Sequence, residues 1–458
     1  MLNPRSGSNE NQEEGIELED MTSLDEGSGA ASAVSTEESG PHWIVEPIRE
    51  EGPWKCLQQF DFSWFAWPVG TGITAIVTHA ISDVSPQITD YFVKASIAYL
   101  VLTIFLFLYF LSLVIFRYCV WPKLFQVTIK NPDSVGHAAM MPTALATIII
   151  ITSKFVDNRP NHLTALWVLW WIAVVVSLVV LCNMLKVSAG APYSFRYRIA
   201  QFIQPFLALT VVAVTRTDLA AQLDSSRAIA TLISSSFILA VGVLFVPLAA
   251  SLQCVVLYGI IPLSTGHIID SFIAFASLAQ TGLAIQHLGE QIYLRLPHTP
   301  GLLPGGFDIA YGGDRLGSFA DVLARTLATE SWFTCLIGLC YVSCIWLAKM
   351  LRSRFKLSFW NAQFSCAFFA LSTYQLKRVS KSFAYVGFFY GILCIMLCNA
   401  YMFMVIGVVV RDGGIKSLLN PWELLGLGNV RRANSPSGPP QQGHDENTHR
   451  TRRQGSGE

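Results

Sequence analysis

Charged residues are scarce in this sequence. They make up 14% of the 458 residues, whereas soluble domains usually carry about 25%. The apolar fraction is 52%, and no polar stretch in the middle of the chain is long enough for a soluble catalytic domain. The net charge is zero, so the composition gives no reason to expect nucleic acid as a partner. The composition instead predicts a chain that lies mostly in a lipid bilayer.

The strict alternation of apolar and polar residues that is typical of a membrane β-barrel is also missing. Lipid cannot hydrogen-bond to the backbone, so a spanning chain must form helices or a closed barrel. A helix crosses the bilayer with about 20 apolar residues, and runs of that length recur along the sequence. They predict an all-α integral membrane protein with ten transmembrane helices. We expect these helices at about 60–82, 95–121, 138–156, 163–186, 199–215, 226–261, 267–289, 318–351, 358–375 and 381–410.

Motifs for catalysis and metal binding are absent from the sequence. The ten cysteines are scattered, and no histidine lies near Cys340 and Cys344, or near Cys394 and Cys398, with the spacing of metal ligands. No nucleophile–base pair or hydrolase, kinase or zinc-protease motif is visible. We therefore expect no enzyme, no metal and no cofactor.

Acids and bases are missing from the centres of the predicted spans. Proton-coupled carriers often keep buried carboxylates or histidines as relays. The absence of such residues favours a channel-like or weakly coupled path. The nearest ionisable residues fall close to predicted helix ends: His79, His137, Asp270, His287 and Arg325.

The two ends of the chain differ in composition from its middle. Residues 1–50 hold twelve acidic and two basic residues, and a segment with so little apolar surface cannot order itself. We predict disordered tails at 1–55 and 416–458, around a membrane domain at 56–415. The acidic tail carries serine and threonine, so it is either a solvated tail or a regulatory segment. Within the membrane domain, prolines and glycines predict one long loop at 291–317.

Ten spans place both termini on the same side of the membrane. The loops after the second, fourth and eighth spans are basic, and those after the first, third, fifth and seventh are acidic. Lysine and arginine accumulate on the cytosolic side of membrane proteins. Although Lys377, Arg378 and Lys381 after the ninth span make the count more even, the rule favours cytosolic termini.

Prolines and polar residues gather in the odd-numbered spans. Spans 1, 3 and 5 contain Pro68, Pro142 and Pro205, which we expect to kink or interrupt them, whereas spans 2, 4 and 10 are more continuously apolar. Irregular or polar backbone is tolerated at membrane depth only where protein or a water-filled cavity receives it. The pattern therefore predicts that the odd spans line a path for solute and that the even spans face lipid.

Four short stretches carry the candidate path residues, and each also has an ordinary structural explanation. Glycine and threonine hydroxyls serve either a cavity or close helix packing, and threonine often bonds to its own helix. A mid-span amide is costly unless it is paired or wetted. The candidates are Gly70, Thr71 and Gly72; Pro142, Thr143 and Thr147; Pro205; Gln280 and Thr281; and Ser365.

These stretches resemble the tellurite-resistance/dicarboxylate transporter family, which contains fungal sulfite efflux pumps, yeast malic-acid transporters and plant slow anion channels. The first is similar to the family's W-F-x-x-x-M-G-T-G opening, and the second to its P-M-G-x-x-T-I segment. The third is similar to the fungal run G-P-x-G-Q-G-x-x-x-I-Q-x-L-G, and the fourth to F-x-x-G-F/W-W-x-x-x-F-P-x-G. The matching residues are Trp64, Phe65, Gly70, Thr71, Gly72, Pro142, Ala144, Thr147, Ile148, Pro205, Gln280, Gly282, Ile285, Gln286, Leu288, Gly289, Phe359, Trp360 and Phe364.

The resemblance implies five helical hairpins around a central anion path, with the odd helices inside, and a homotrimer. It also places the family's gating phenylalanine at Phe364, since an aromatic ring blocks a narrow pore by its bulk and by dewetting. Two departures stand out. Ala276-Ser277 replaces a Gly-Pro pair, and Ser365 replaces the proline after the gate. Both changes should straighten inner helices and narrow the path.

The function that the sequence favours is transport of a small anion, with sulfite efflux across the plasma membrane ahead of transport of malate or another dicarboxylate. Sulfite is compact enough for a narrow neck, whereas malate needs a wider cavity with donors. A membrane receptor or scaffold that transports nothing is the alternative from another class. The partners expected in every case are the lipid bilayer and, for transport, the anion itself.

Overall fold

A computed structural model of the chain describes residues 55–58, 60–82, 88–156, 159–190, 199–220, 223–258, 265–295, 309–350 and 359–411. All the described residues belong to one compact unit. The expected tails at 1–55 and 416–458 lie outside the described residues, apart from Lys55.

The described residues form helices and no strands. Ten long helices dominate: α2 (Ala66–Ser82), α3 (Thr89–Val120), α6 (Met140–Phe155), α7 (Pro160–Gly190), α8 (Ile199–Ala220), α9 (Ser225–Tyr258), α10 (Thr265–Arg295), α11 (Ile309–Met350), α12 (Trp360–Gln375) and α13 (Lys381–Arg411). Five short elements accompany them: α1 (Lys55–Gln58), η1 (Phe62–Phe65), α4 (Pro122–Lys130), α5 (Pro132–Ala138) and η5 (Leu376–Arg378).

The long helices coincide with the ten expected ranges, but the expected loop at 291–317 is wrong at both ends. Helix α10 continues to Arg295, and α11 already begins at Ile309. The glycines at 312, 313 and 317 therefore lie inside a helix. Each glycine costs a helix only about 1 kcal/mol relative to alanine, so a long helix tolerates several. The three prolines of the expected loop fall between 295 and 309, outside the described residues.

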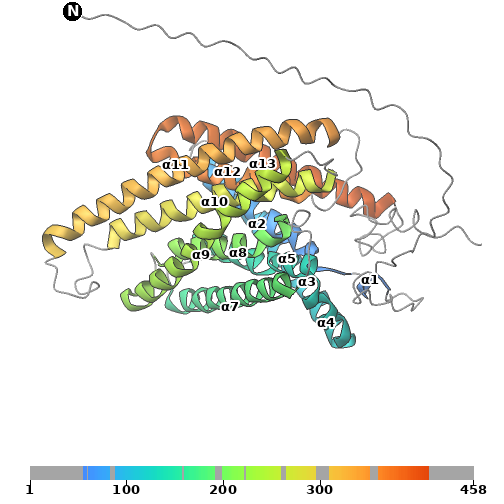
Figure 1. The fold of residues 1–458 in the computed structure, drawn as a ribbon. Coiled ribbons are helices and arrows are strands. Elements are labelled where there is room, and N and C mark those ends of the chain that lie inside the picture. Colours follow the sequence, from blue (N-terminus) through green and yellow to red (C-terminus); the bar gives the residue numbers. More distant parts are fainter. Residues whose placement is uncertain are drawn as a thin grey trace, which may run out of the picture. The chain divides into compact units, whose positions relative to one another are not determined.

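Contacts between helices form a closed ring. Helix α2 contacts α6, α6 contacts α8, α8 contacts α10, α10 contacts α12, and α12 returns to α2. Figure 1 labels α2, α8, α10 and α12 among these helices. These five helices, which we call the inner ring, are separated in the sequence by the other five long helices. The chain thus alternates between the ring and a second set of helices outside it.

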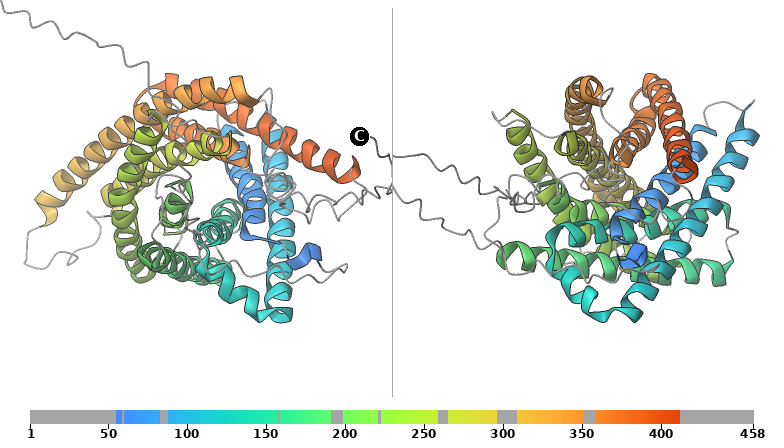
Figure 2. Two further views of the ribbon diagram at one scale, coloured as in Figure 1. Left: turned by 45° about the vertical axis from the view of Figure 1, so that its right-hand side comes forward. Right: turned by 90° about the vertical axis from the view of Figure 1, so that its right-hand side faces the viewer.

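Each outer helix packs against two neighbours of the inner ring. Helix α3 contacts α2 and α6, α7 contacts α6 and α8, and α9 contacts α8 and α10. In the same way, α11 contacts α10 and α12, and α13 contacts α12 and α2. Both views in Figure 2 show the pairing of α2, in dark blue, with α3, in lighter blue.

Apolar side chains on the outer helices remain exposed. Phe105 of α3 is 64% exposed, Phe237 of α9 is 72% exposed and Phe403 of α13 is 73% exposed. By contrast, most residues of α2 and α12 are buried. A helix needs apolar side chains wherever it faces lipid, whereas a helix that is buried among other helices does not. The burial pattern therefore fits a protein whose outer helices face lipid.

Length and hydropathy give six candidate spans among the described residues: Thr89–Val120, Pro132–Phe155, Pro160–Ala189, Ser226–Val255, Ser318–Ile345 and Lys381–Gly407. Five of them lie in the outer helices, and the sixth joins α5 to α6 of the inner ring. Helices α2 and α12, with 17 and 16 residues, are as short as α6 and shorter than the remaining long helices. Their burial explains why their sequences are also less uniformly apolar.

Two of the three expected breaks at proline are helix beginnings instead. Pro68 is the third residue of α2 and Pro142 the third residue of α6. Amides in the first turn have no partner within the helix, so proline costs little there. Pro205 does lie inside α8, and Pro247, which the sequence reasoning did not single out, lies inside α9.

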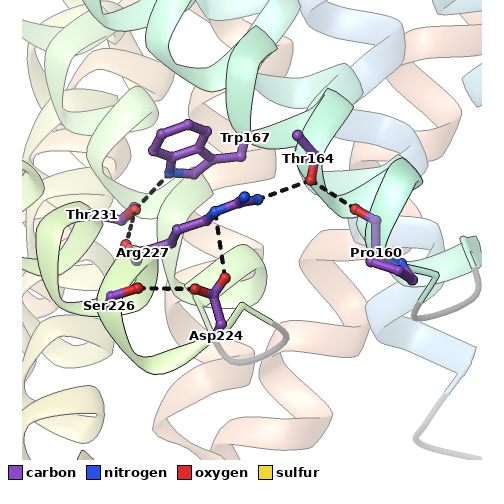
Figure 3. A network of polar contacts seen from close by, with 7 residues as sticks. All are labelled: Pro160, Thr164, Trp167, Asp224, Ser226, Arg227 and Thr231. Carbon is purple, nitrogen blue, oxygen red and sulfur yellow. Dashed lines mark hydrogen bonds and ion pairs between the residues drawn. The ribbon is translucent and has the colours of Figure 1, made fainter.

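A polar network joins the beginnings of the outer helices α7 and α9 (Figure 3). The Arg227 guanidinium donates to Thr164 Oγ1 at 2.9 Å and lies 5.5 Å from the centre of the Trp167 ring. Trp167 Nε1 donates in turn to Thr231 Oγ1 at 3.0 Å. Arg227 also pairs with Asp224 at 3.5 Å. The network ties together two helices that both pack on α8.

Candidate transport path

Contacts to neighbouring helices define the sides of α12. The Gln363 amide faces α2, where it donates to Gly70 O at 3.1 Å. Ser365 faces α10, because its hydroxyl lies 2.7 Å from Phe272 O. Thr373 faces outward and accepts a hydrogen bond from Trp332 Nε1 of α11 at 2.7 Å. The remaining side of α12 lies between its two ring neighbours and away from α11.

Phe364 occupies that remaining side. Successive helix residues are turned by about 100°, so Phe364 points midway between the α2-facing Gln363 and the α10-facing Ser365. It is only 1% exposed. Phe368 follows one turn later on the same side and is 3% exposed. The family resemblance identified Phe364 alone, although the spacing of four residues between two phenylalanines is visible in the sequence.

The outer side of α10 is marked by its contacts with α11. A Cβ added at Gly289 would meet the Ala324 side chain, and one added at Gly338 of α11 would meet the Phe275 ring. Gln280 follows Phe275 by five positions, which turns it by about 140° from that side. The amide of Gln280 therefore points toward the interior of the ring.

Gln280 is buried without full hydrogen bonding. Its side chain is 1% exposed, and its Oε1 has no hydrogen-bond partner among the described residues. A buried polar atom without a partner costs about 1–3 kcal/mol. Since the two ends of a glutamine amide can exchange places by rotation, the same position can present either an acceptor or an N–H donor. The Gln280 amide can therefore form a hydrogen bond with a solute or with water.

Gln204 of α8 is a second such amide, and the sequence reasoning missed it. Phe206 stacks on Phe245 of α9 at 4.7 Å and so marks the outer side of α8. Gln204 precedes Phe206 by two positions and points about 160° away from it. It is 3% exposed, and its Oε1 also lacks a partner among the described residues. In the sequence, Gln204 is a single glutamine just before Pro205. It belongs to no cluster of polar residues that would mark it as a candidate.

The three candidates on α2 contact other helices. A Cβ added at Gly70 would lie against the Trp360 ring of α12, and one at Gly72 would lie against Thr147 of α6. Thr71 Oγ1 accepts a hydrogen bond from Thr103 of α3 at 2.9 Å. Each residue therefore has a packing role at a different interface, and a role in lining the path stays a prediction.

The candidates on α6 bond to their own helix. Thr143 Oγ1 donates to Ala139 O, and Thr147 Oγ1 donates to Ala144 O, each at 2.8 Å. The Thr147 side chain also fills the space above Gly72. Pro142 is buried in the first turn. These contacts account for the hydroxyl groups without a solute.

The remaining candidates lie on α8, α10 and α12. Pro205 is buried inside α8. Thr281 Oγ1 donates to Ser277 O of its own helix at 2.7 Å. Ser365, which stands where the resemblance expects proline, lies 2.8 Å from Asn361 O as well as near α10. The serine therefore holds α12 to α10, and both helices run without interruption through the positions of the two departures.

Taken together, the interior side of the ring offers two aromatic rings and two amides that lack a hydrogen-bond partner at Oε1. Arg117 is the one charged side chain among the buried residues that the structure describes, and it lies on α3 outside the ring. Conduction requires that an ion bind well enough to enter and weakly enough to leave. Neutral amide donors meet this requirement for an anion better than a buried cation does.

Comparison with known proteins identifies the family. The sequence profile described as "Voltage-dependent anion channel" matches residues 59–409. The chain belongs to this family. It is similar to proteins named "Sulfite efflux pump SSU1": the one from Arthroderma benhamiae is 25% identical over 371 residues, which cover 78% of this chain and 93% of the relative. The protein of that name from Trichophyton rubrum matches to the same extent. The counterpart from Arthroderma otae is 24% identical over 362 residues, or 76% and 90% of the two chains.

Membership in the anion channel family confirms the resemblance read from the four stretches. The matched range begins just before η1 and ends near the end of α13, so it contains the whole inner ring and nearly all of the outer helices. The protein is therefore an integral membrane protein of an anion-transporting family, and the part of the chain that the structure describes is helical.

Proposed function

We propose that the protein moves a small anion through the inner ring, and that sulfite is the anion. The closed ring carries this proposal. Phe364, Gln280 and Gln204 are buried, and the turn of about 100° per residue places each of them away from the outer side of its helix. The relatives named as sulfite efflux pumps favour sulfite over malate. A compact oxyanion needs only a narrow neck with a few N–H donors, whereas a dicarboxylate needs more room. The flux we propose is efflux across the plasma membrane.

The membrane arrangement that we propose has ten spans in five hairpins. Helices α2, α6, α8, α10 and α12 form the inner wall, and each is followed by its outer partner. The contacts of each outer helix with two ring helices support this arrangement. Both termini are then on the cytosolic side. Protease added to sealed right-side-out cells should spare both tails, and cleavage of either tail would contradict the arrangement.

The assembly that we propose is a homotrimer, as the family resemblance implies. The exposed apolar side chains of the outer helices, such as Phe389 and Met396 of α13, are available to lipid or to another copy. The mass of the protein in detergent, corrected for bound detergent, distinguishes a trimer from a monomer.

Flux measurements test the choice of anion. Purified protein is reconstituted into vesicles, and uptake of radiolabelled sulfite and malate is measured in the same preparation, with protein-free vesicles as the control. We expect sulfite flux well above the control and little malate flux. Malate flux equal to sulfite flux would favour a dicarboxylate transporter, and no flux of either anion would favour a receptor or scaffold.

Thiol labelling tests whether the path runs inside the ring. A cysteine at Gln280 should react with a small water-soluble thiol reagent, whereas one at Phe275 of the same helix should not, because Phe275 faces α11. The same test at Thr71, Thr147 and Thr281 asks whether these predicted path residues are wetted. Val174 of α7, which is buried, serves as a second protected control. Equal protection at Gln280 and Phe275 would mean that the amide is only a packing feature.

A further inference from the structure

The short helix α4 lies where a membrane span ends. Helix α3 is a candidate span up to Val120, and only Trp121 separates it from Pro122, the first residue of α4. Pro122 stands at the first helical position, where proline is well suited to begin a helix. With a single residue between them, α4 cannot lie far from the surface of the bilayer in which α3 is embedded.

One side of α4 faces the protein and the other is exposed. Thr128 is buried. Lys123 and Lys130 are exposed, and Phe125, which lies between them in the sequence, is 46% exposed. Lys123 and Lys130 are seven positions apart and share one side of α4, whereas Phe125 lies on the opposite side. A helix with lysines on one side and an aromatic ring on the other is typical of the membrane interface, where the ring enters the acyl region and the amines meet headgroups.

Aromatic contacts stabilise the junction between α3 and α4. The Phe125 ring meets the Tyr118 ring edge to face at 5.2 Å. The Arg117 guanidinium lies 5.2 Å from the centre of the Tyr118 ring, and it donates to the Tyr118 hydroxyl at 3.3 Å. Tyrosine and tryptophan are enriched where spans meet water, as Tyr118 and Trp121 do here.

A third lysine comes from α7. Asn183 Nδ2 donates to Ile129 O at 3.0 Å, which joins the end of α7 to the end of α4. Lys186 follows Asn183 by about one turn and is exposed, and Lys130 is the residue after Ile129. The two lysines therefore flank a contact between two helices. The nearest acid along the chain, Asp133, has interactions of its own.

We propose that Lys123, Lys130 and Lys186 form a binding site for the headgroup of an anionic phospholipid, with Phe125 inserted among its acyl chains. Charge complementarity and the position at the end of a span favour lipid as the occupant. The site lies on outer helices and does not depend on which anion passes through the ring. Transport and lipid binding can therefore fail independently.

The test uses the full-length protein in a neutral detergent. Dioctanoyl phosphatidylglycerol is titrated, and binding is followed by the rise in melting temperature and by native mass spectrometry. We expect saturable binding to the parent, and none of comparable strength for dioctanoyl phosphatidylcholine. The variant K123A/K130A/K186A should bind phosphatidylglycerol about tenfold or more weakly, since each lysine near an anionic lipid contributes a separate attraction.

A charge-matched control removes three lysines elsewhere. Lys94, Lys154 and Lys381 are exposed and lie in the second turn of α3, in the last turn of α6 and at the first residue of α13. The variant K94A/K154A/K381A should bind like the parent. The single reversal Lys123→Glu provides a second variant with little risk to folding, because Lys123 is exposed, and it should also weaken binding.

Three results would overturn the proposal. The first is equal loss of binding in the control variant, which would indicate a general charge effect. The second is equal stabilisation by inorganic phosphate, which would indicate a soluble anion instead of lipid. The third is the absence of binding to the parent, which would indicate that another occupant covers the lysines, such as the acidic segment at residues 1–50.

Discussion

The side-chain amide of Gln363 donates a hydrogen bond to the main-chain oxygen of Gly70, with nitrogen and oxygen 3.1 Å apart. The same nitrogen lies 2.8 Å from Thr74 Oγ1 and 3.3 Å from Cys394 Sγ. One fully buried amide therefore connects α12, α2 and α13. This contact closes the inner ring between its first and last helices.

Replacing Gln363 should loosen that closure. Gln363→Ala removes the donor and leaves the oxygen of Gly70 with one partner fewer, at a cost of about 1–3 kcal/mol. Thermal unfolding in detergent should show a clear fall in melting temperature. Asn399→Ala is the control, because its amide is exposed and donates to Ile395 O of its own helix. A fall of the same size in the control would remove the special role of Gln363.

Gly70 should tolerate no side chain. A Cβ at this position would collide with the Trp360 ring and would lie 2.9 Å from Gln363 Oε1. Because Trp360 is fully buried, Gly70→Ala should cost about 1–3 kcal/mol by overpacking. At Gly407 of α13 nothing lies within 4 Å of an added Cβ, so Gly407→Ala should be neutral or stabilising by up to about 1 kcal/mol. A lower melting temperature for Gly70→Ala, with no decrease for Gly407→Ala, would verify this prediction, and equal decreases would contradict it.

Phe364 and Phe369 form a matched pair for testing the gate. Both rings are buried, at 1% and 0% exposure, but Phe369 stacks on Trp332 of α11 at 5.3 Å and therefore faces outward. Phe364→Ala should leave the protein folded and raise anion conductance, since a dewetted neck becomes wider. Phe369→Ala should cost about 3–5 kcal/mol of stability and add no conductance.

Recordings at equal surface expression provide the measurement for this pair. Conductance unchanged in Phe364→Ala would exclude the ring from gating. The same variant of Phe368, which lies on the same side of α12, tells whether one ring or two close the neck.

Arg227 should stabilise the junction of α7 and α9 mainly through Thr164 and Trp167. Its ion pair with Asp224 is exposed, at 43% and 59% for the two side chains, and exposed pairs contribute little and are screened by salt. Arg227→Ala should lower stability by about 1–2 kcal/mol through the lost hydrogen bond and cation–π contact. Lys94→Ala breaks the exposed pair with Asp90 and should change stability far less. Melting curves at low and high salt should show that the Arg227 effect persists at high salt.

The number and type of the long helices were predictable from the sequence alone. Lipid permits few backbone structures, so apolar runs of spanning length indicate helices with little ambiguity. The four polar and aromatic stretches, in order along the chain, also sufficed to predict the family. The ends of α10 and α11 were not predictable in the same way, because the cost of a few glycines is small beside the packing of a long helix pair.

The direction of each side chain was decided only by the tertiary structure. Gly70, Thr71 and Gly72 are adjacent in the sequence, yet they face α12, α3 and α6. The residue types do not indicate which neighbour each one faces, since a glycine or a threonine fits a cavity wall and a helix contact equally well. Gln204 and Gln280 are candidates because they are buried and lack a hydrogen-bond partner at Oε1. Both properties depend on every neighbouring helix. The sequence determined that the chain crosses a membrane as helices of an anion-transporting family, because lipid and local pattern act on each segment separately. Which residues meet at the centre depends on the closure of the ring, and closure is a property of all five inner helices at once.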